Sequence, residues 1–129
     1  MTSTENPTPA SSNSILDFPE VHRHQRGYDF YAPELAKLPD LYDTEEVEAA
    51  DKMILAHFFI GGSDWWIAEI DKSDGMMFGY VRMNNDDQNS EWGYSDLVAL
   101  ESLQLDNGMV IDRDLHWTPT KFSDINMGA

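Results

Sequence analysis

The chain has 129 residues, the length of one ordinary domain, and 41% of them are hydrophobic, which is enough for a packed core. Its 24 acidic and 8 basic residues give a net charge of −16, a field that repels nucleic acid and anionic membranes and attracts basic protein surfaces. The sequence has no cysteine for disulfides or thiolate chemistry, and neither a transmembrane run nor a secretory signal, so a cytoplasmic protein is expected.

The first part of the chain, residues 1–28, is predicted to be a disordered or weakly ordered tail before a single acidic domain at residues 29–129. Residues 1–14 are polar and rich in Ser, Thr and Pro, and cannot bury apolar area. An apolar cluster at residues 15–18 is free to dock on the domain or on a partner. Three acids and two bases precede the domain, which itself carries 21 acids and six bases.

A short helix is predicted over residues 33–38, because Pro33 suits the first turn and Leu35 and Leu38 would face inward. An acidic linker at residues 40–51 follows this helix. It contains six of the acidic residues: Asp40, Asp43, Glu45, Glu46, Glu48 and Asp51.

The middle of the chain predicts an antiparallel meander, because three apolar runs are separated by glycine-rich or polar turns. These runs cover residues 53–60, 65–70 and 76–83. A short strand at residues 91–94, a helix at residues 96–104 with Ser95 as its N-cap, and a last strand at residues 109–117 are expected to follow.

These elements predict an α+β fold, with an antiparallel sheet of four to five strands and one or two helices packed on one face. The residues expected to pack together between sheet and helix are Phe58, Ile67, Phe78, Leu97, Leu100 and Ile111.

From about Phe30 onward the chain resembles a family of small proteins of bacteria, plasmids and phages known as domain of unknown function 2958. The motifs that carry the likeness are Leu35-Ala36-Lys37-Leu38-Pro39, Ala56-His57-Phe58-Phe59, Trp65-Trp66 with Glu69, Phe78-Gly79, Glu91-Trp92-Gly93-Tyr94, Leu100-Glu101 and the segment Asp112–Pro119. The resemblance implies a home on mobile elements or in their hosts. It implies no activity, cofactor or catalytic residue.

The acidic surface is the strongest functional signal in the sequence. We expect a non-enzymatic accessory protein of a phage or plasmid that binds a basic surface of a host protein, for instance a nucleic-acid-binding defence component, by mimicking DNA. A surface kept acidic for solubility is the alternative, because net charge says nothing about its layout. The expected contact residues are the linker acids Asp40, Asp43, Glu45, Glu46 and Glu48 and the loop acids Asp86 and Asp87.

A second interpretation is a small-ligand or peptide-binding module with an aromatic cleft. Its candidate residues are Trp65, Trp66, Trp92, Tyr94 and Trp117, each of which could instead fill the core. Trp65 and Trp66 are adjacent, so in a strand they must point to opposite faces of the sheet. If one of these faces is less buried, one of the two is a surface aromatic that could bind a partner.

An enzyme using Asp112, Asp114 and His116 is the third interpretation, set against a structural ion-pair network around Arg113. His57 lies inside an apolar run and is expected to be a hydrogen-bonded residue of the interior or of a sheet edge. No metal site is expected, because the His22-x-His24 pair lacks further ligands. No cofactor and no direct contact with nucleic acid or membrane is expected.

Overall fold

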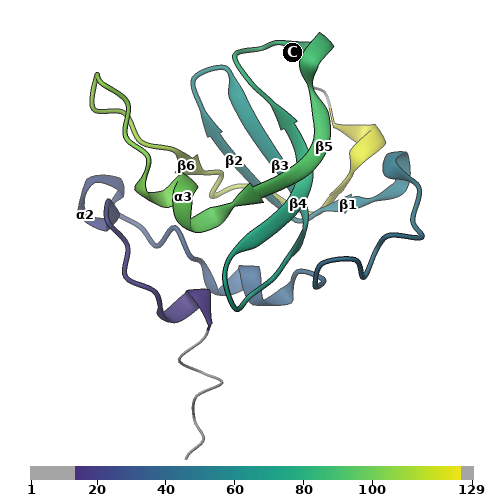
Figure 1. Ribbon diagram of the computed structural model, residues 1–129, viewed down its shortest axis with the longest axis horizontal. Coiled ribbons are helices and arrows are strands. Elements are labelled where there is room, and N and C mark those ends of the chain that lie inside the picture. The colour runs from purple at the N-terminus through teal and green to yellow at the C-terminus, as the bar shows by residue number, and fades with distance from the viewer. Residues whose placement is uncertain (1–13, 126–129) are drawn as a thin grey trace, which may run out of the picture.

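The computed structural model describes residues 14–125, and Figure 1 shows them arranged around one twisted sheet. Five antiparallel strands form this sheet in the order β5-β4-β3-β2-β6. Their bounds are β2 Ala56–Ile60, β3 Ser63–Ile70, β4 Met76–Arg82, β5 Glu91–Asp96 and β6 Asp112–Arg113. A second sheet pairs β1 (Met53–Ile54) with β7 (Thr120–Lys121).

The helices are short, and none among the described residues is long and apolar enough to cross a membrane. Within residues 14–125 the two α-helices are α2 (Arg23–Arg26) and α3 (Leu97–Ser102). The 3-10 helices are η1 Ile15–Asp17, η2 Pro33–Lys37, η3 Ala49–Asp51, η4 Asp87–Asn89 and η5 Phe122–Asp124. The predicted α+β architecture is confirmed.

The two faces of β3 divide the core, because neighbouring residues of a strand point to opposite faces. Trp65 and Ile67 belong to the main core, whereas Trp66 and Ala68 belong to a smaller cluster on the other face. Both faces of β3 are covered and all its eight residues are buried, so neither tryptophan offers a free surface. The opposite orientations predicted for the two tryptophans are therefore confirmed.

Five of the six predicted core residues pack together in the main core, and the sixth, Phe78, does not. Met77 takes the core position, with 0% of its surface exposed, and Phe78 faces the other side of β4 and stacks on Trp92. The prediction failed here because β4 is apolar on both faces, so alternation does not reveal which face is inside.

Gly79 is required by the close approach of β3 and β4. A Cβ at this position would lie 2.1 Å from the carbonyl oxygen of Trp66. The same stretch contains a bulge, since Ile67 pairs with Gly79 but Glu69 pairs with Phe78, which leaves Ala68 as the additional residue.

Helix α3 is capped by Asp96 and not by Ser95, because the Asp96 carboxylate accepts from the N–H groups of Val98 and Ala99 at 3.0 and 3.4 Å. The helix ends at Ser102, two residues before the predicted end. Leu103, which continues the helical spacing of Leu97 and Leu100, is 41% exposed because it follows the helix.

The last predicted strand, residues 109–117, is also shorter than expected. Only Asp112–Arg113 pairs with β2, and Val110 forms an isolated bridge with Gln104. A turn over Asp114–Trp117 ends the pairing, because the Asp114 carboxylate accepts from the N–H of His116 at 3.0 Å.

Residues 14–28, which the sequence analysis assigned to the tail, lie against the domain. Ile15 is fully buried in the main core, and its N–H donates to the carbonyl oxygen of Lys72 at 2.8 Å. The side chain of Arg26 is likewise 0% exposed. The apolar cluster at residues 15–18 thus docks on the domain itself, and the disorder expected for residues 1–13 lies outside the described residues.

Candidate functional site

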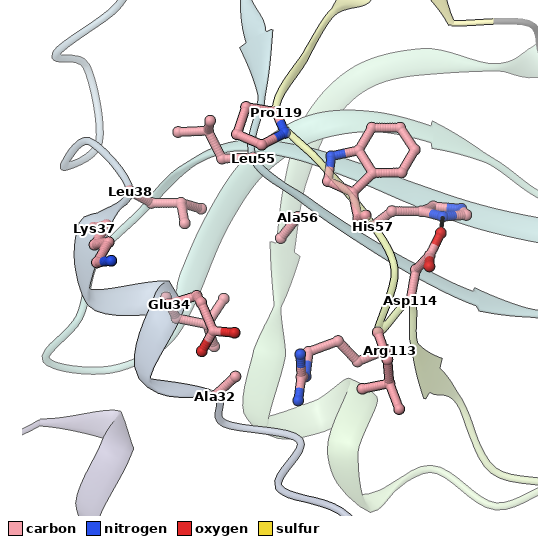
Figure 2. Close-up of a pocket in the computed structure, with 13 residues that line it drawn as sticks. Ala32, Glu34, Lys37, Leu38, Leu55, Ala56, His57, Arg113, Asp114 and Pro119 are labelled. Atoms are coloured by element: carbon pink, nitrogen blue, oxygen red, sulfur yellow. Dashed lines mark hydrogen bonds and ion pairs between the residues drawn. The ribbon is translucent and has the colours of Figure 1, made fainter.

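A cavity of about 300 Å³ opens between η2, β2 and the segment that follows β6. Figure 2 shows the side chains of Glu34, from η2, and Arg113, from β6, pointing toward one another, and both residues line the cavity. Its apolar lining comes from Ala32, Leu35, Leu38, Leu55, Ala56, Leu115, Trp117 and Pro119. A concave apolar site with a few charged groups is the usual form of a ligand pocket.

His57 forms one polar wall of this cavity. Its Nδ1 lies 3.1 Å from Oδ2 of Asp114, and its Nε2 lies 2.8 Å from Oδ1 of Asp64. The contact with Asp114 is drawn as a dashed line in Figure 2. Only an imidazole with both nitrogens protonated can donate to both carboxylates. The ring also stacks on Trp66, with centroids 5.3 Å apart and planes inclined by 4°. The expectation of a hydrogen-bonded His57 is confirmed.

The network of polar contacts continues through Asp64 to Arg82. The second carboxylate oxygen of Asp64 accepts from Arg82 at 2.9 Å, and Arg82 also reaches Asp87 at 3.3 Å. The hydrogen bond with Asp64 raises the pKa of Arg82, although burial opposes it. Three side chains of this network are no more than 13% exposed, so its main effect is to hold β2, β3 and β4 in register.

Residues 34–125 match the model of a family described as "Protein of unknown function (DUF2958)". This match covers more than half of the chain. The protein belongs to the DUF2958 family. No curated protein and no solved structure matches the chain.

Three of the segments that carry the DUF2958 resemblance meet around the cavity, although they are far apart in the sequence. Residues 35–38, Ala56-His57 and residues 113–119 all contribute side chains to its lining. This convergence could not be predicted from the motifs alone, because only the pairing of β2 with β6 brings the second and third segments together. The three motifs could be recognised in the sequence, but the cavity at which they meet could not.

The carboxylates considered for catalysis are engaged separately. Asp112 accepts from the Tyr28 hydroxyl at 2.7 Å, and Asp114 binds His57. Burial, followed by this hydrogen bond, raises the pKa of Tyr28 to about 12. Arg113 donates to the carbonyl oxygen of Asp29 at 2.8 Å and forms no ion pair within the described residues. The network expected around Arg113 is therefore wrong: His57, not Arg113, joins Asp114 to a second carboxylate.

The metal interpretation also gains no support from the geometry. Within residues 14–125 no group of three or more His, Asp or Glu side chains is arranged to hold a metal ion. His22 lies at the start of α2, where its Nε2 is 3.1 Å from the carbonyl oxygen of Ser102.

All seven acids predicted as contact residues are exposed. They lie in two loops near opposite ends of the β4–β5 pair. Asp86 and Asp87 follow the end of β4. The linker lies near the start of β4, because the N–H groups of Tyr42 and Thr44 donate to Glu69, and Glu69 pairs there with Phe78. Hydrogen bonds from Asn89 lower the pKa of Asp86.

The acidic linker is attached to the sheet through Glu69, which the sequence analysis quoted only as part of a motif. The Glu69 carboxylate is 3% exposed and accepts from the N–H groups of Tyr42 and Thr44 at 2.7 and 2.9 Å. The buried Lys52 ammonium donates to the carbonyl oxygen and, at 2.9 Å, to the hydroxyl of Thr44. One inward carboxylate and one inward ammonium thus fix a loop whose other charges face solvent.

Trp65 and Trp66 do not form a binding surface, since they are 6% and 4% exposed. Of the aromatic residues considered for a cleft, only Trp117 lines the cavity beside His57, and its indole N–H donates to the carbonyl oxygen of Ile54 at 2.9 Å. Trp92 and Tyr94 lie on β5, the edge strand at the other end of the sheet order.

Proposed function

We propose that the protein is a non-enzymatic acidic binding protein that occupies a basic surface of a partner protein. The observation that supports this proposal is the state of the linker acids. The carboxylates of Glu45, Glu46 and Glu48 are exposed and form no hydrogen bond or ion pair within the described residues. Charges that stabilise nothing in the fold remain available to a partner, and they accelerate encounter with a surface of opposite charge.

The layout of the acids supports an elongated contact. Glu91 and Asp96, at the two ends of edge strand β5, are both exposed and lie between the linker and the loop that holds Asp86 and Asp87. Carboxylates are thus present at both ends of this edge, although that of Asp96 also caps α3. A duplex spanning roughly 26 Å, twice the ~13 Å radius of gyration of a 100-residue domain, carries about 15 charges. The domain carries a similar net charge, with 21 acids and six bases.

The partner that fits this array is a host protein with a basic, nucleic-acid-binding surface. In this proposal the protein is carried by a phage or plasmid, acts in the host cytoplasm and inhibits a defence component by offering carboxylates where that component binds phosphates. Like-charge repulsion keeps nucleic acid itself from binding.

The experiment that tests the proposal is affinity capture from host lysate on the immobilised protein, eluted in separate arms with salt and with duplex DNA. We expect basic nucleic-acid-binding proteins to be retained at low ionic strength and released by either eluent, because both compete for the same cationic surface. Retained proteins that resist salt and DNA would contradict the proposal.

A second candidate function, a module that binds a small ligand or a peptide, is favoured by the cavity beside His57. Leu115 lies at this cavity and is 52% exposed, so a charged side chain there would fill the opening at little cost to the core. If this candidate is the correct one, Leu115→Glu should abolish capture of the partner, whereas capture by the parent should persist at higher salt. In the acidic-surface proposal, Leu115→Glu leaves capture unchanged.

A further inference from the structure

A second cavity, of about 270 Å³, lies between the acidic linker and strands β4 and β5, and neither the family description nor the sequence analysis assigns a role to it. It is lined by Tyr42, Glu45, Lys52, Glu69, Phe78 and Tyr94. Three of these six side chains are aromatic and two are carboxylates, a combination that suits a cation.

The aromatic rings form a continuous surface that reaches solvent. Tyr94 contacts Phe78 at a centroid distance of 5.2 Å and Tyr42 at 6.5 Å. Tyr42 and Tyr94 are 59% and 53% exposed, and they are the two aromatic side chains among the exposed large hydrophobic residues of the described chain. Tyrosine is enriched in the residues that dominate binding energy at protein interfaces.

The backbone of Tyr42 is held in a conformation that tyrosine rarely adopts. Its φ is 74°, in the left-handed region, and the buried Glu69 carboxylate accepts from its N–H at 2.7 Å. A bulky residue in this region costs free energy, and such strain gathers at binding sites and active sites. A glycine would adopt this conformation freely, so the fold alone gives no reason for a tyrosine here.

The charges around the cavity favour a cation. Glu45 lines it, and the exposed acids Asp43, Glu46 and Glu48 belong to the same linker. Lys52 is the one basic group in the lining, and its ammonium is turned toward Thr44 while lying 5.9 Å from the Phe78 ring centroid. With Glu69 bound to the linker backbone, the two carboxylates and one ammonium leave a net negative charge.

We propose that this cavity receives an arginine side chain of the basic partner, with its guanidinium against the rings of Tyr42 and Tyr94 and its N–H groups donating to Glu45. This inference rests on the proposed function, since it names the point at which the basic surface docks. Arginine fits better than lysine, because a planar guanidinium stacks on aromatic rings while pairing with a carboxylate.

The test uses the full chain and two peptides, acetyl-Gly-Arg-Gly-amide and the same peptide with citrulline, which keeps the shape of arginine without its charge. The ring proton resonances of Tyr42 and Tyr94 are followed by NMR as each peptide is added. We expect the arginine peptide to shift both sets of resonances and the citrulline peptide to leave them in place. Equal shifts with both peptides, or shifts only at other acidic residues, would overturn the inference.

The decisive variant is Tyr42→Gly, because it separates folding from binding. It relieves the strained backbone and removes the ring, so we expect the urea midpoint to stay equal or rise. Affinity for the arginine peptide should fall about fivefold, the size of one exposed cation–π contact. Asn84→Gly, at another exposed residue with a positive φ (52°) but outside this cavity, is the matched control and should bind like the parent. Undiminished binding by Tyr42→Gly would overturn the inference.

The two proposals can fail separately. If Tyr42→Gly binds the captured basic partner as tightly as the parent, and binding remains salt-sensitive, the acidic-surface function stands and the arginine site is wrong. If no basic partner is captured but the arginine peptide binds at Tyr42 and Tyr94, the site stands and the proposed function is wrong.

Discussion

Arg26 and Glu101 form an ion pair of 2.7 Å whose side chains are 0% and 1% exposed, and the pair joins the N-terminal segment to helix α3. The Glu101 carboxylate also accepts from the N–H groups of Val21 and His22, both at 2.9 Å. The Arg26 guanidinium donates in addition to the carbonyl oxygen of Ile111 and lies 4.0 Å from the Phe30 ring centroid. Residues 14–28 are therefore part of the folded domain.

Glu101→Gln should destabilise the protein by about 3–5 kcal/mol, because it leaves the buried Arg26 charge without its counter-charge. The free energy of unfolding is measured by urea denaturation. Arg23→Gln is the control: its ion pair with Asp29 involves side chains that are 49% and 64% exposed, so we expect a loss below about 1 kcal/mol. Equal losses for both variants would contradict the structural role of Glu101.

The same carboxylate should make stability depend on acid pH. Burial raises the pKa of Glu101, but the N–H groups of His22 and Val21 and the Arg26 guanidinium outweigh it, so the pKa is lowered overall. The folded state therefore binds the proton less readily than the unfolded state, and the stabilisation is lost as the pH falls through the lowered pKa. Stability against pH should fall less steeply in acid for Glu101→Gln than for the parent.

Two phenylalanines should differ in their contribution to the core. Phe58 is 0% exposed in the main core, and Phe58→Ala should cost about 3–5 kcal/mol. Phe78→Ala should cost clearly less, because Phe78 is only partly buried on the other face of the sheet. A larger loss for Phe78→Ala in urea denaturation would mean that Phe78, not Met77, occupies the core.

The two carboxylates that bind Arg82 provide a second matched pair. Asp64→Asn removes partners from both His57 and Arg82 and should cost about 1.5–3 kcal/mol, the range for hydrogen bonds to charged groups. Asp87→Asn alters a side chain that is 69% exposed and should change stability little. Thermal unfolding of both variants measures whether the contacts of Asp64 with His57 and Arg82 stabilise the packing of β2, β3 and β4.

Tyr28 should weaken the fold at alkaline pH. Its pKa of about 12 in the folded protein lies above the ordinary value of 10.0, so the unfolded chain loses this proton first. The free energy of unfolding therefore falls as the pH rises from the ordinary pKa of 10.0 toward the raised pKa of about 12. Tyr28→Phe removes this contribution, and its stability should decline less in the same interval. An identical alkaline decline in both proteins would contradict the assignment.

Much of the fold could be predicted because local patterns are strong in this sequence. The apolar runs around Phe58 and Ile67 identified the central strands, and the adjacency of Trp65 and Trp66 fixed their opposite orientations. The pattern failed where it was ambiguous: β4 is apolar on both faces, and Ser95 and Asp96 are both good caps. In the second case the carboxylate of Asp96 binds the helix N–H groups.

The sites were harder to predict, because they depend on contacts between distant residues. His57 meets Asp114 across 57 positions and Glu69 binds the N–H of Tyr42 across 27. Composition indicated an acidic surface and the linker acids are indeed exposed, but no local pattern indicates that Tyr42 and Tyr94 share a cavity. Pairings of this kind follow from the sheet register, which sequence periodicity alone does not determine.

We expect the exposed linker acids to attract the basic partner electrostatically, so the association rate of the captured partner is measured as a function of ionic strength. The triple variant Glu45→Gln, Glu46→Gln, Glu48→Gln is compared with the parent. A matched variant, Asp17→Asn, Asp106→Asn, Asp124→Asn, removes the same charge at exposed positions outside the proposed contact. We predict a steep decline with salt for the parent, a slower rate and a flatter dependence for the linker variant, and a smaller change for the matched variant. Equal rates and equal salt dependence for the parent and the linker variant would contradict the account.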